Sequence, residues 1–401
     1  SGLFWEVSAV TMFEVYLKAG RDKPVRMGHP WIFSGAISKV VETGENGGQC
    51  RIFSHNGEYL ALGYYNPQSA INVRILSHHN EKFDSDTLKF RIARAVSARR
   101  AILDNKTDSC RLVNSEGDFV PGLIVDKYSS GLVIQILTAG MELFRNSIID
   151  ILNQELSPAF IYERSDTDAR KREGLAESSG ILTGKVPENL LLSENGLKFR
   201  ADVESGQKTG FFFDQRQNRN LLKRYAFDRR MCDCFCYSGA FSVNALSAGV
   251  KSVDLVDISR SALRWAEENV LENGFSKEKV NFISSDIFKY LRESDRKYDL
   301  IILDPPKFAR HPGELRTACR GYKDINLIAI KKIEPEGIIF TFSCSNAVDP
   351  KLFRQIVFSA AADAGRQVQV LHVLSSGPDH PVNIAHKEGE YLKGLVLKVL
   401  E

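Results

Sequence analysis

A chain of 401 residues is too long for one ordinary hydrophobic core, so two or three domains are expected, and 43% hydrophobic residues are enough to fill them. The formal net charge of +3 is mild, so any attraction to nucleic acid must come from local clusters rather than a field over the whole molecule. No apolar run is long enough to cross a bilayer and the start lacks the form of a secretory signal, so a cytoplasmic protein is expected.

Seven cysteines occur in the chain and form no regular framework. Three of them, Cys232, Cys234 and Cys236, crowd into one predicted strand, where they are expected to point to opposite faces and so to have poor geometry for a single tetrahedral metal site. We therefore expect reduced, buried thiols and no bound metal.

Short β-like runs broken by glycine predict a β-rich module over residues 12–80. Its predicted strands are Phe13–Leu17, Gln49–Phe53, Leu60–Tyr65 and Ile71–Leu76. Ser1-Gly2 resembles a cloning remnant, which makes Met12 a candidate natural start. The module could pair with another copy of the chain to form a homodimer.

Cations and aromatic residues alternate between the first strands of this module, and the candidates for RNA contact are Arg26, His29, Trp31 and Phe33. Cations attract phosphates, and aromatic faces stack on unpaired bases. The alternative is that Trp31 and Phe33 are core residues and the cations form an ordinary solvated rim. The stretch Gly28–Gly35 resembles the start of a PUA-like RNA-binding domain, and this resemblance favours the RNA contact.

Residues 81–190 predict a compact α+β domain in the middle of the chain. An amphipathic helix is expected from Ser85 to about Asp104, with Arg99 and Arg100 on its solvated flanks. Three strand-like runs and a second helix follow, at Cys110–Asn114, Leu123–Asp126, Gly131–Ile136 and Met141–Leu156.

Three consecutive phenylalanines, Phe211–Phe213, lie within a dense polar set just before the C-terminal domain's first strand. They could simply pack on the core. The functional interpretation is that the surrounding polar residues close over a ligand held by the first loop of the following sheet. The candidate ligand-binding residues are Lys208, Thr209, Phe212, Gln215 and Arg216.

Residues 191–401 predict an α/β domain with a doubly wound, mainly parallel, Rossmann-like sheet. The loop after its first strand has one glycine, Gly239, rather than the three of a dinucleotide fingerprint, so NAD and FAD are disfavoured. A ligand without phosphates fits better. The candidate contacts around this loop are Asp233, Cys236, Tyr237, Ser238, Gly239 and Ala240.

Acidic residues end the next two strands. Asp257 ends the second strand, where its carboxylate can accept both hydroxyls of a ribose, with Ile258 beside it. Asp286 ends the third strand, where it can accept an amine such as that of adenine while Ile287 packs on the ring. An adenosine without phosphates points to S-adenosylmethionine as the cofactor. Each acid could instead be a helix N-cap, the usual role of Asp at such a turn.

The fourth strand delivers Asp304-Pro305-Pro306, in which two prolines stiffen the turn above the sheet edge. The fifth strand ends at Cys344, a thiol placed to act as a nucleophile, although a lone cysteine is more often an inert buried hydrophobe. Phe308 or Tyr322 could stack on a base. The residues near enough in sequence to line a substrate pocket are Pro305, Lys307, Phe308, Tyr322 and Lys323.

A thiol and a carboxylate at neighbouring strand ends suit methylation of carbon 5 of cytosine. Because this carbon is a poor nucleophile, addition of the Cys344 thiolate to carbon 6 would turn the ring into an enamine that can attack a sulfonium methyl group. Asp304 could bind or protonate the ring nitrogen and stabilise the charge that develops. The base must come from a loop or be flipped out of a stack.

Motifs over nearly the whole chain resemble the bacterial large-subunit rRNA methyltransferase I family. They are Gly28–Trp31, Pro121–Asp126, Gln207–Phe212, Asp214–Arg216, Asp304–Phe308, Arg320–Asp324 and Gly389–Gly394. The resemblance implies a PUA domain, a central α+β domain and a Rossmann-like methyltransferase domain that forms 5-methylcytosine in 23S rRNA. It puts the family's thiol nucleophile at Cys344, and Pro306 stands where many RNA cytosine-5 methyltransferases carry a second cysteine.

Two other interpretations stay open. The fourth-strand motif is also typical of enzymes that methylate exocyclic amines, or a guanine ring nitrogen, for which the Asp304 loop suffices and Cys344 is structural. A non-catalytic RNA-binding assembly factor is a third class, against which the acids Asp257, Asp286 and Asp304 argue. Asp379-His380-Pro381 could reach the active site, but an ordinary solvated loop is the expectation.

Overall fold

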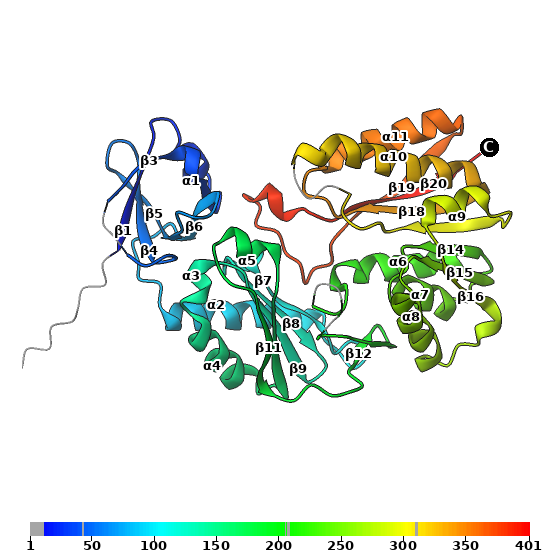
Figure 1. The fold of residues 1–401 in the computed structure, drawn as a ribbon, viewed down its shortest axis with the longest axis horizontal. Coiled ribbons are helices and arrows are strands. Elements are labelled where there is room, and N and C mark those ends of the chain that lie inside the picture. Colours follow the sequence, from blue (N-terminus) through cyan, green and yellow to red (C-terminus); the bar gives the residue numbers. More distant parts are fainter. Residues whose placement is uncertain (1–11, 42–43, 205, 207–208, 309–311) are drawn as a thin grey trace, which may run out of the picture.

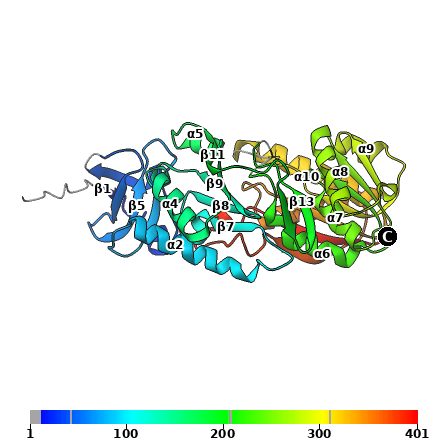
Figure 2. The ribbon, with the colours of Figure 1, turned by 90° about the horizontal axis from the view of Figure 1, so that it is seen from below.

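The structure is a computed structural model that describes residues 12–41, 44–204, 206, 209–308 and 312–401. Ser1, Gly2, Gln207 and Lys208, named above, lie outside the described residues. Figure 1 shows three sheet-containing units that follow one another in sequence, with the blue N-terminal unit at one end. The view from below in Figure 2 shows the same order along the long axis. No helix in the described ranges is long and apolar enough to span a bilayer.

The N-terminal unit is one six-stranded sheet. Its strands are β1 (Phe13–Leu17), β2 (Trp31–Phe33), β3 (Ile37–Val41), β4 (Gln49–Phe53), β5 (Tyr59–Tyr65) and β6 (Ile71–Ser77). They lie in the order β2-β6-β5-β4-β1-β3. Alternate residues of β1 are buried, as expected for a strand with one face on the core. The four strands predicted here are confirmed to within one residue at each end.

The middle unit is a five-stranded sheet packed against helices α2 (Ser85–Ala98) and α4 (Arg145–Leu156). Its strands are β7 (Cys110–Asn114), β8 (Leu123–Tyr128), β9 (Gly131–Ile136), β10 (Phe160–Ser165) and β11 (Ser178–Gly184), in the order β11-β10-β9-β8-β7. The single helix predicted over Met141–Leu156 is wrong. The chain leaves the helical conformation at Phe144, whose ring packs edge-on against Phe83, and so separates a short α3 (Ala139–Glu142) from α4.

Arg99 does not lie on a solvated flank. The chain tightens into a 3-10 turn over Arg99–Ala101, and the Arg99 side chain is only 2% exposed. Its guanidinium donates to both carboxylate oxygens of Asp118, at 2.8 and 2.6 Å, and to the backbone oxygen of Asp379 at 3.1 Å. Because a buried charge must be paired, this arginine joins the middle unit to the C-terminal unit. Arg100 is exposed, as expected.

The C-terminal unit is built on a seven-stranded sheet. Its strands are β14 (Arg230–Cys234), β15 (Ser252–Asp257), β16 (Val280–Ser284), β17 (Tyr298–Leu303), β18 (Ile333–Ser343), β19 (Val368–Ser375) and β20 (Lys393–Val399). The order is β16-β15-β14-β17-β18-β20-β19, and only the two pairings of β20 are antiparallel. The predicted doubly wound, mainly parallel sheet is confirmed. Its strand order reverses between β14 and β17, the point where open α/β sheets bind ligands.

Helices cover both faces of this sheet. One face packs on α6 (Arg216–Ala226), α7 (Ala240–Ser247) and α8 (Arg260–Glu272). The other packs on α9 (Ile287–Glu293), α10 (Leu315–Lys332) and α11 (Pro350–Ala364). Because neither face meets water, the central strands are continuous apolar runs, and residues 300–303 of β17 are all fully buried. A small hairpin, β12 (Leu191–Glu194) with β13 (Leu197–Arg200), precedes the sheet.

The three clustered cysteines are buried, as predicted, but their expected geometry is wrong. Cys232 and Cys234 lie two residues apart on β14 and therefore point to the same face, with their Sγ atoms 3.6 Å apart. Cys236 lies beyond the strand, after Phe235 with its φ of 61°, and packs in the core of the opposite face. Burial raises the pKa of the Cys232 and Cys236 thiols, which keeps them protonated.

A buried network of charges joins the middle and C-terminal units. The Asp379 carboxylate accepts hydrogen bonds from the Arg216 guanidinium at 3.0 Å and from the Arg111 backbone N–H at 3.3 Å. Arg216 and Arg219 also donate to Glu194 of β12. Asp379 is fully buried, so it compensates an arginine charge that water cannot reach.

The loop Asp379-His380-Pro381 is therefore not solvated, and this prediction is wrong. His380 is 5% exposed, and its ring nitrogen lies 3.1 Å from the Asp379 carboxylate. Burial lowers the pKa of His380, which favours the neutral ring. The loop is buried because the Asp379 carboxylate neutralises the buried charge of Arg216.

We predict that Asp379→Asn lowers the free energy of unfolding by roughly 3 kcal/mol, because it leaves the buried Arg216 without a full counter-charge. Burial opposes ionisation of Asp379, but the contacts with His380 and Arg216 lower its pKa. Its contribution is therefore present above the usual Asp pKa and is lost as pH falls through the lower, folded-state pKa. Urea unfolding at neutral pH measures the change.

Asp363→Asn is the matched control, because Asp363 forms an exposed pair with Lys323. Its urea midpoint should match that of the wild type. Equal midpoints for Asp379→Asn and Asp363→Asn would show that the buried network does not hold the two units together.

Candidate active site

The loop after β14 forms one wall of a cavity at the strand-order reversal. Tyr237 and Gly239 have φ values of 47° and 71°, so the loop turns sharply before α7 begins at Ala240. A Cβ at Gly239 would lie 2.9 Å from side-chain atoms of both Ala266 and Leu255, so only glycine fits between α8 and the sheet. This close packing sets Tyr237 and Ser238 at the cavity wall.

Asp257 ends β15 and lines the same cavity. One carboxylate oxygen accepts a hydrogen bond from the Tyr237 backbone N–H at 3.0 Å, and the other accepts one from the Ser259 N–H at 2.8 Å. These two bonds orient the carboxylate and leave acceptor capacity on both oxygens. Asp257 is therefore arranged to accept a pair of hydroxyl groups.

Asp304 follows β17 and is oriented by a short chain of amides. The Gln215 Nε2 donates to Asp304 Oδ2 at 3.0 Å, and the Asn218 Nδ2 donates to Gln215 Oε1 at 2.6 Å. Asn218 also donates to the backbone oxygen of Ser375, so the chain of hydrogen bonds is anchored on β19. The Asp304 carboxylate is fixed in direction while it faces the cavity.

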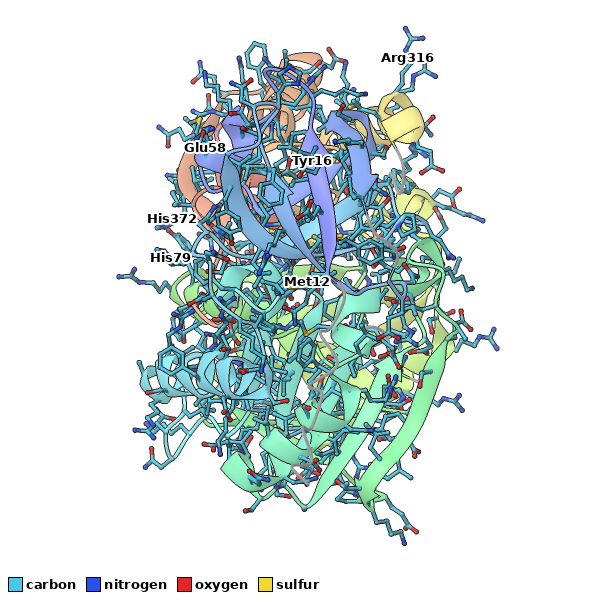
Figure 3. The ribbon with its side chains drawn as sticks, turned by 90° about the vertical axis from the view of Figure 1, so that its left-hand side faces the viewer. Met12, Tyr16, Glu58, His79, Arg316 and His372 are labelled. Carbon is cyan, nitrogen blue, oxygen red and sulfur yellow. The ribbon has the colours of Figure 1, made fainter. Side chains whose placement is uncertain are left out.

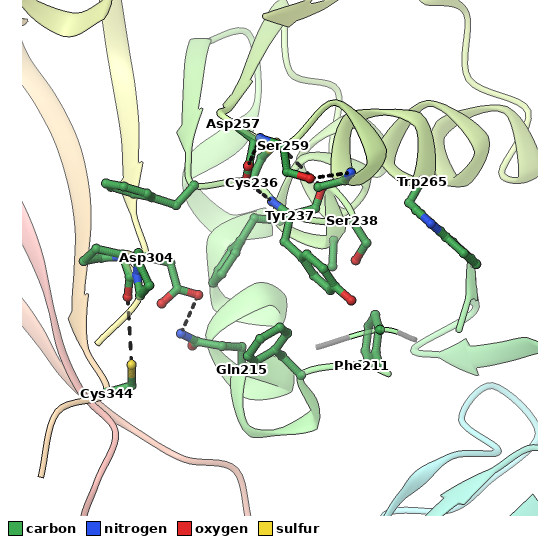
Figure 4. Close-up of a pocket in the computed structure, with 18 of the residues that line it drawn as sticks. Phe211, Gln215, Cys236, Tyr237, Ser238, Asp257, Ser259, Trp265, Asp304 and Cys344 are labelled. Carbon is green, nitrogen blue, oxygen red and sulfur yellow. Dashed lines mark hydrogen bonds between the residues drawn. The ribbon is translucent and has the colours of Figure 1, made fainter. Parts of the chain in front are cut away.

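Cys344 follows β18 on the same side of the cavity as Asp304, as Figure 4 shows. The thiol is partly buried, and its Sγ donates to the backbone oxygen of Pro305 at 3.9 Å. Strands β17 and β18 are parallel neighbours, which explains why their carboxyl ends bring these residues together. A thiol and a carboxylate thus face one substrate space.

The cavity has a volume of about 610 Å³, which suits a nucleoside-sized ligand. Aromatic rings form much of its wall, and those of Phe212 and Tyr237 meet edge to face with centroids 5.4 Å apart. The cations among its described lining residues are Lys307 and Arg219, and Arg219 is already paired with Glu194. The wall therefore offers rings and carboxylates to a ligand rather than a phosphate cradle.

Three acids converge below and beside this cavity. Asp233 is 1% exposed and accepts a hydrogen bond from the Ser242 hydroxyl at 2.6 Å. Burial, helped by the negative charges of Asp304 and Asp257, raises the pKa of Asp233 to about 7. The site is therefore electronegative, which favours a cationic ligand such as a sulfonium.

The structure brings most of the predicted site residues of the C-terminal domain to this cavity. They are Phe212, Gln215, Cys236, Tyr237, Ser238, Ala240, Asp257, Ile258, Asp304, Pro305, Lys307 and Cys344. Asp233 and Gly239 support the wall from behind.

Thr209 and Arg216 do not line the cavity, contrary to prediction. The Thr209 hydroxyl donates to the buried Asp126 carboxylate at 2.6 Å, and Arg216 belongs to the Asp379 network. Both side chains point into the interior, because each donates a hydrogen bond to a buried carboxylate. Of the three phenylalanines, Phe211 and Phe212 line the cavity, while Phe213 packs in the core together with part of Phe211, so each interpretation holds for part of the run.

Tyr322, Phe308 and Lys323 also lie away from the described cavity wall. Tyr322 is fully buried on α10, with its ring 4.7 Å from that of Phe308, so it is not available to stack on a base. Phe308 packs on Tyr322 and Phe288. Lys323 pairs with Asp363 of α11 at 2.7 Å. Tyr322 and Lys323 thus serve to pack α10 on its neighbours.

Asp286 and Ile287 follow the N-cap alternative. The Asp286 carboxylate accepts a hydrogen bond from the Lys289 backbone N–H at 2.9 Å and caps α9. Ile287 is 4% exposed and packs beneath the sheet. Neither residue is among those that line the cavity.

In the N-terminal unit, Trp31 is a contact between units. Its Nε1 donates to Glu116 of the middle unit at 2.8 Å, and its ring lies 4.3 Å from that of His386. His29 lies 3.2 Å from the Glu388 carboxylate. The side chains at this edge therefore connect all three units, which differs from both the core and the RNA-contact interpretations.

Arg26 and Phe33 remain on the surface of the same unit. Arg26 pairs with Asp22 and with Glu58, which Figure 3 labels on the side of the N-terminal sheet. Phe33 is 46% exposed. These two residues are accessible to a large ligand.

Part of the cavity wall is formed by residues that the sequence does not single out. Trp265 on α8, Phe235 in the first loop and Leu392 before β20 all line it. Phe235 and Leu392 carry no local polar pattern. A signal existed for Trp265, since an aromatic residue early in the helix after an acidic strand end can face the ligand.

These features fit an adenosine that carries no phosphate. Asp257 offers acceptors for a ribose, the rings offer stacking surfaces, and the three acids suit a positive charge at the centre of the ligand. S-adenosylmethionine has these chemical parts.

Comparison with known proteins agrees with this geometry. The chain matches the family model of a PUA-like domain over residues 15–78 and that of an S-adenosylmethionine-dependent methyltransferase over residues 167–388. A Tolumonas auensis protein named ribosomal RNA large subunit methyltransferase I is 44% identical, covering 96% of this chain and 99% of the relative. A Shewanella amazonensis protein of the same name is 41% identical with the same coverage.

Solved structures share the fold. A methyltransferase complexed with SAH has a TM-score of 0.85 at 21% identity, and the match covers 97% of this chain and 100% of that one. A Streptococcus mutans protein described as SAM-dependent has a TM-score of 0.84 at 20% identity, with the same coverage.

The expected cofactor is confirmed as S-adenosylmethionine by the family match. The relatives align with this chain over nearly its full length. The chain belongs to the ribosomal RNA large subunit methyltransferase I family.

Proposed function

We propose that this chain methylates carbon 5 of a cytosine in 23S rRNA, with the Cys344 thiolate as nucleophile. The observation that carries the proposal is the Cys344 sulfur, which lies 3.9 Å from the Pro305 carbonyl oxygen and shares one cavity with Asp304 and Asp257. The names of the relatives supply the class of RNA.

Cys344 forms the covalent bond in this proposal. Its sulfur adds to carbon 6 of the cytosine, and the electron pair of the 5,6 double bond becomes available at carbon 5. When bound, S-adenosylmethionine supplies the electrophilic methyl group for that carbon. Loss of the carbon-5 proton to a base then expels the thiolate and restores the aromatic ring.

Asp304 holds the cytosine during these steps. Its carboxyl group binds the ring nitrogen, or protonates it, and so stabilises the charge that the thiolate brings to the ring. Gln215 and Asn218 keep the group in one orientation, which avoids a reorganisation cost during the reaction. Lys307 lines the same cavity and is the proposed contact for the RNA backbone.

The RNA is proposed to reach the site along the N-terminal module, where Arg26 and Phe33 are exposed. Residues 12–80, 81–190 and 191–401 are kept as the proposed domain limits. A homodimer and a cytoplasmic location stay predictions.

We predict that Cys344→Ala lowers methyl transfer at least about a thousandfold, because no other group supplies the covalent step. Cofactor affinity should change less than about threefold, since the thiol contacts the base rather than the adenosine. Transfer of a labelled methyl group to unmodified rRNA measures the first, and calorimetry measures the second. Mass spectrometry identifies the product nucleoside.

Cys319→Ala is the matched control, because Cys319 is the other partly buried cysteine and lies on α10 outside the cavity wall. It should retain activity. If Cys344→Ala stays active, or the product is a methylated amine or guanine, the Asp304 loop acts without the thiol.

We predict that Asp257→Ala weakens S-adenosylmethionine binding by about 10- to 100-fold, the loss expected when hydrogen bonds to a charged acceptor are removed. Titration calorimetry measures this. Asp286→Asn keeps the helix cap and should leave affinity nearly unchanged. A comparable loss of S-adenosylmethionine affinity in Asp286→Asn would show that Asp286 contributes to the adenosine site.

A further inference from the structure

Lys393 is a buried cation next to the candidate nucleophile. It begins β20 and pairs in register with Ser343, the residue before Cys344. The residue is 4% exposed, and its Nζ donates to the backbone oxygens of Ser345 and Val348, both at 2.6 Å. The ammonium therefore lies against the turn that carries the thiol.

Burial of this ammonium is unfavourable by itself. It lowers the pKa of Lys393 to about 8, and the negative form of Cys344 is the leading opposing influence. Asp349 and Glu390 add negative charge around the ammonium, and Lys307 adds positive charge. The two backbone oxygens satisfy hydrogen bonds but neutralise no charge.

We propose that Lys393 is a positioning residue for Cys344, which fixes the turn over residues 345–348 and stabilises the thiolate form of the nucleophile. The inference rests on the proposed function, since it assigns a use to the Cys344 thiolate. It also gives a physical reason for a buried lysine at the start of β20.

The need for a cation follows from the surroundings of the thiol. Burial alone raises the pKa of a thiol, as it does for Cys232 on β14 and for Cys236 in the loop after it. The Tyr322 and Tyr391 hydroxyls near Cys344 stay neutral at physiological pH, because burial raises the pKa of both. A buried ammonium is weakly screened by salt, so it favours the thiolate more strongly than the solvated end of a surface lysine would.

The test is the pH dependence of Cys344 alkylation by iodoacetamide, followed on the Cys344 peptide by mass spectrometry. We expect Lys393→Met to raise the apparent pKa of this thiol by at least about one unit, which lowers its alkylation rate near pH 7 about tenfold. Lys393→Arg should keep most of the wild-type reactivity, because it retains a positive charge. Alkylation of Cys319 in the same samples provides an internal reference.

Lys398→Met is the matched control, because Lys398 lies on the same strand and pairs with Glu336 near the surface. In this variant, Cys344 should be alkylated with the same pH dependence as in the wild type. An unchanged pH profile in Lys393→Met overturns the inference. If Lys393→Met no longer binds S-adenosylmethionine, the alkylation profile of Lys393→Arg is used as the test. This variant keeps a positive charge, so a shift of its Cys344 alkylation profile to higher pH overturns the inference.

Methyl transfer separates this inference from the proposed function. If Cys344→Ala remains active while Lys393→Met shifts the alkylation profile, the thiolate is stabilised but is not the nucleophile. If Cys344→Ala is inactive and the profile does not shift, the thiol acts without help from Lys393.

Discussion

Strand direction decides where chemistry can occur in this molecule. Because β14, β15, β17 and β18 run parallel, their carboxyl ends meet at one edge, and the reversal of strand order opens a space there. Residues far apart in the sequence, such as Asp257, Asp304 and Cys344, become neighbours through this single constraint. The helices cover the two faces of the sheet, and Asp304 and Cys344 lie partly buried at its carboxyl edge.

Buried charges fix the units against one another. Asp379 binds groups from α6 and β7, and Arg99 reaches the same segment from the end of α2. Such contacts tolerate little displacement, because each buried charge would lose its partner. Together with Trp31, which touches Glu116 and His386, they hold the N-terminal sheet at a set position relative to the cavity.

The sequence predicts the helices and strands better than it predicts the directions of side chains. Apolar runs and strand-end acids located the sheet and most of the cavity, because both follow from local chemistry. Arg99, Thr209 and Tyr322 were misjudged, since each is buried by a partner that is distant in sequence: Asp118, Asp126 and Phe353. The neighbours of Lys393 could not be predicted for the same reason, although the motif that contains it, Gly389–Gly394, is recognisable in the sequence.

The position of β20 carries a consequence for synthesis on the ribosome. This strand follows β19 in the chain but is inserted between β18 and β19. A nascent chain that has emerged only as far as β19 therefore exposes the long apolar edge of β18, which invites aggregation or chaperone binding. The Lys393 ammonium is also missing from the end of β18 at that stage. The full reactivity of the Cys344 thiol would arise only when the sheet closes.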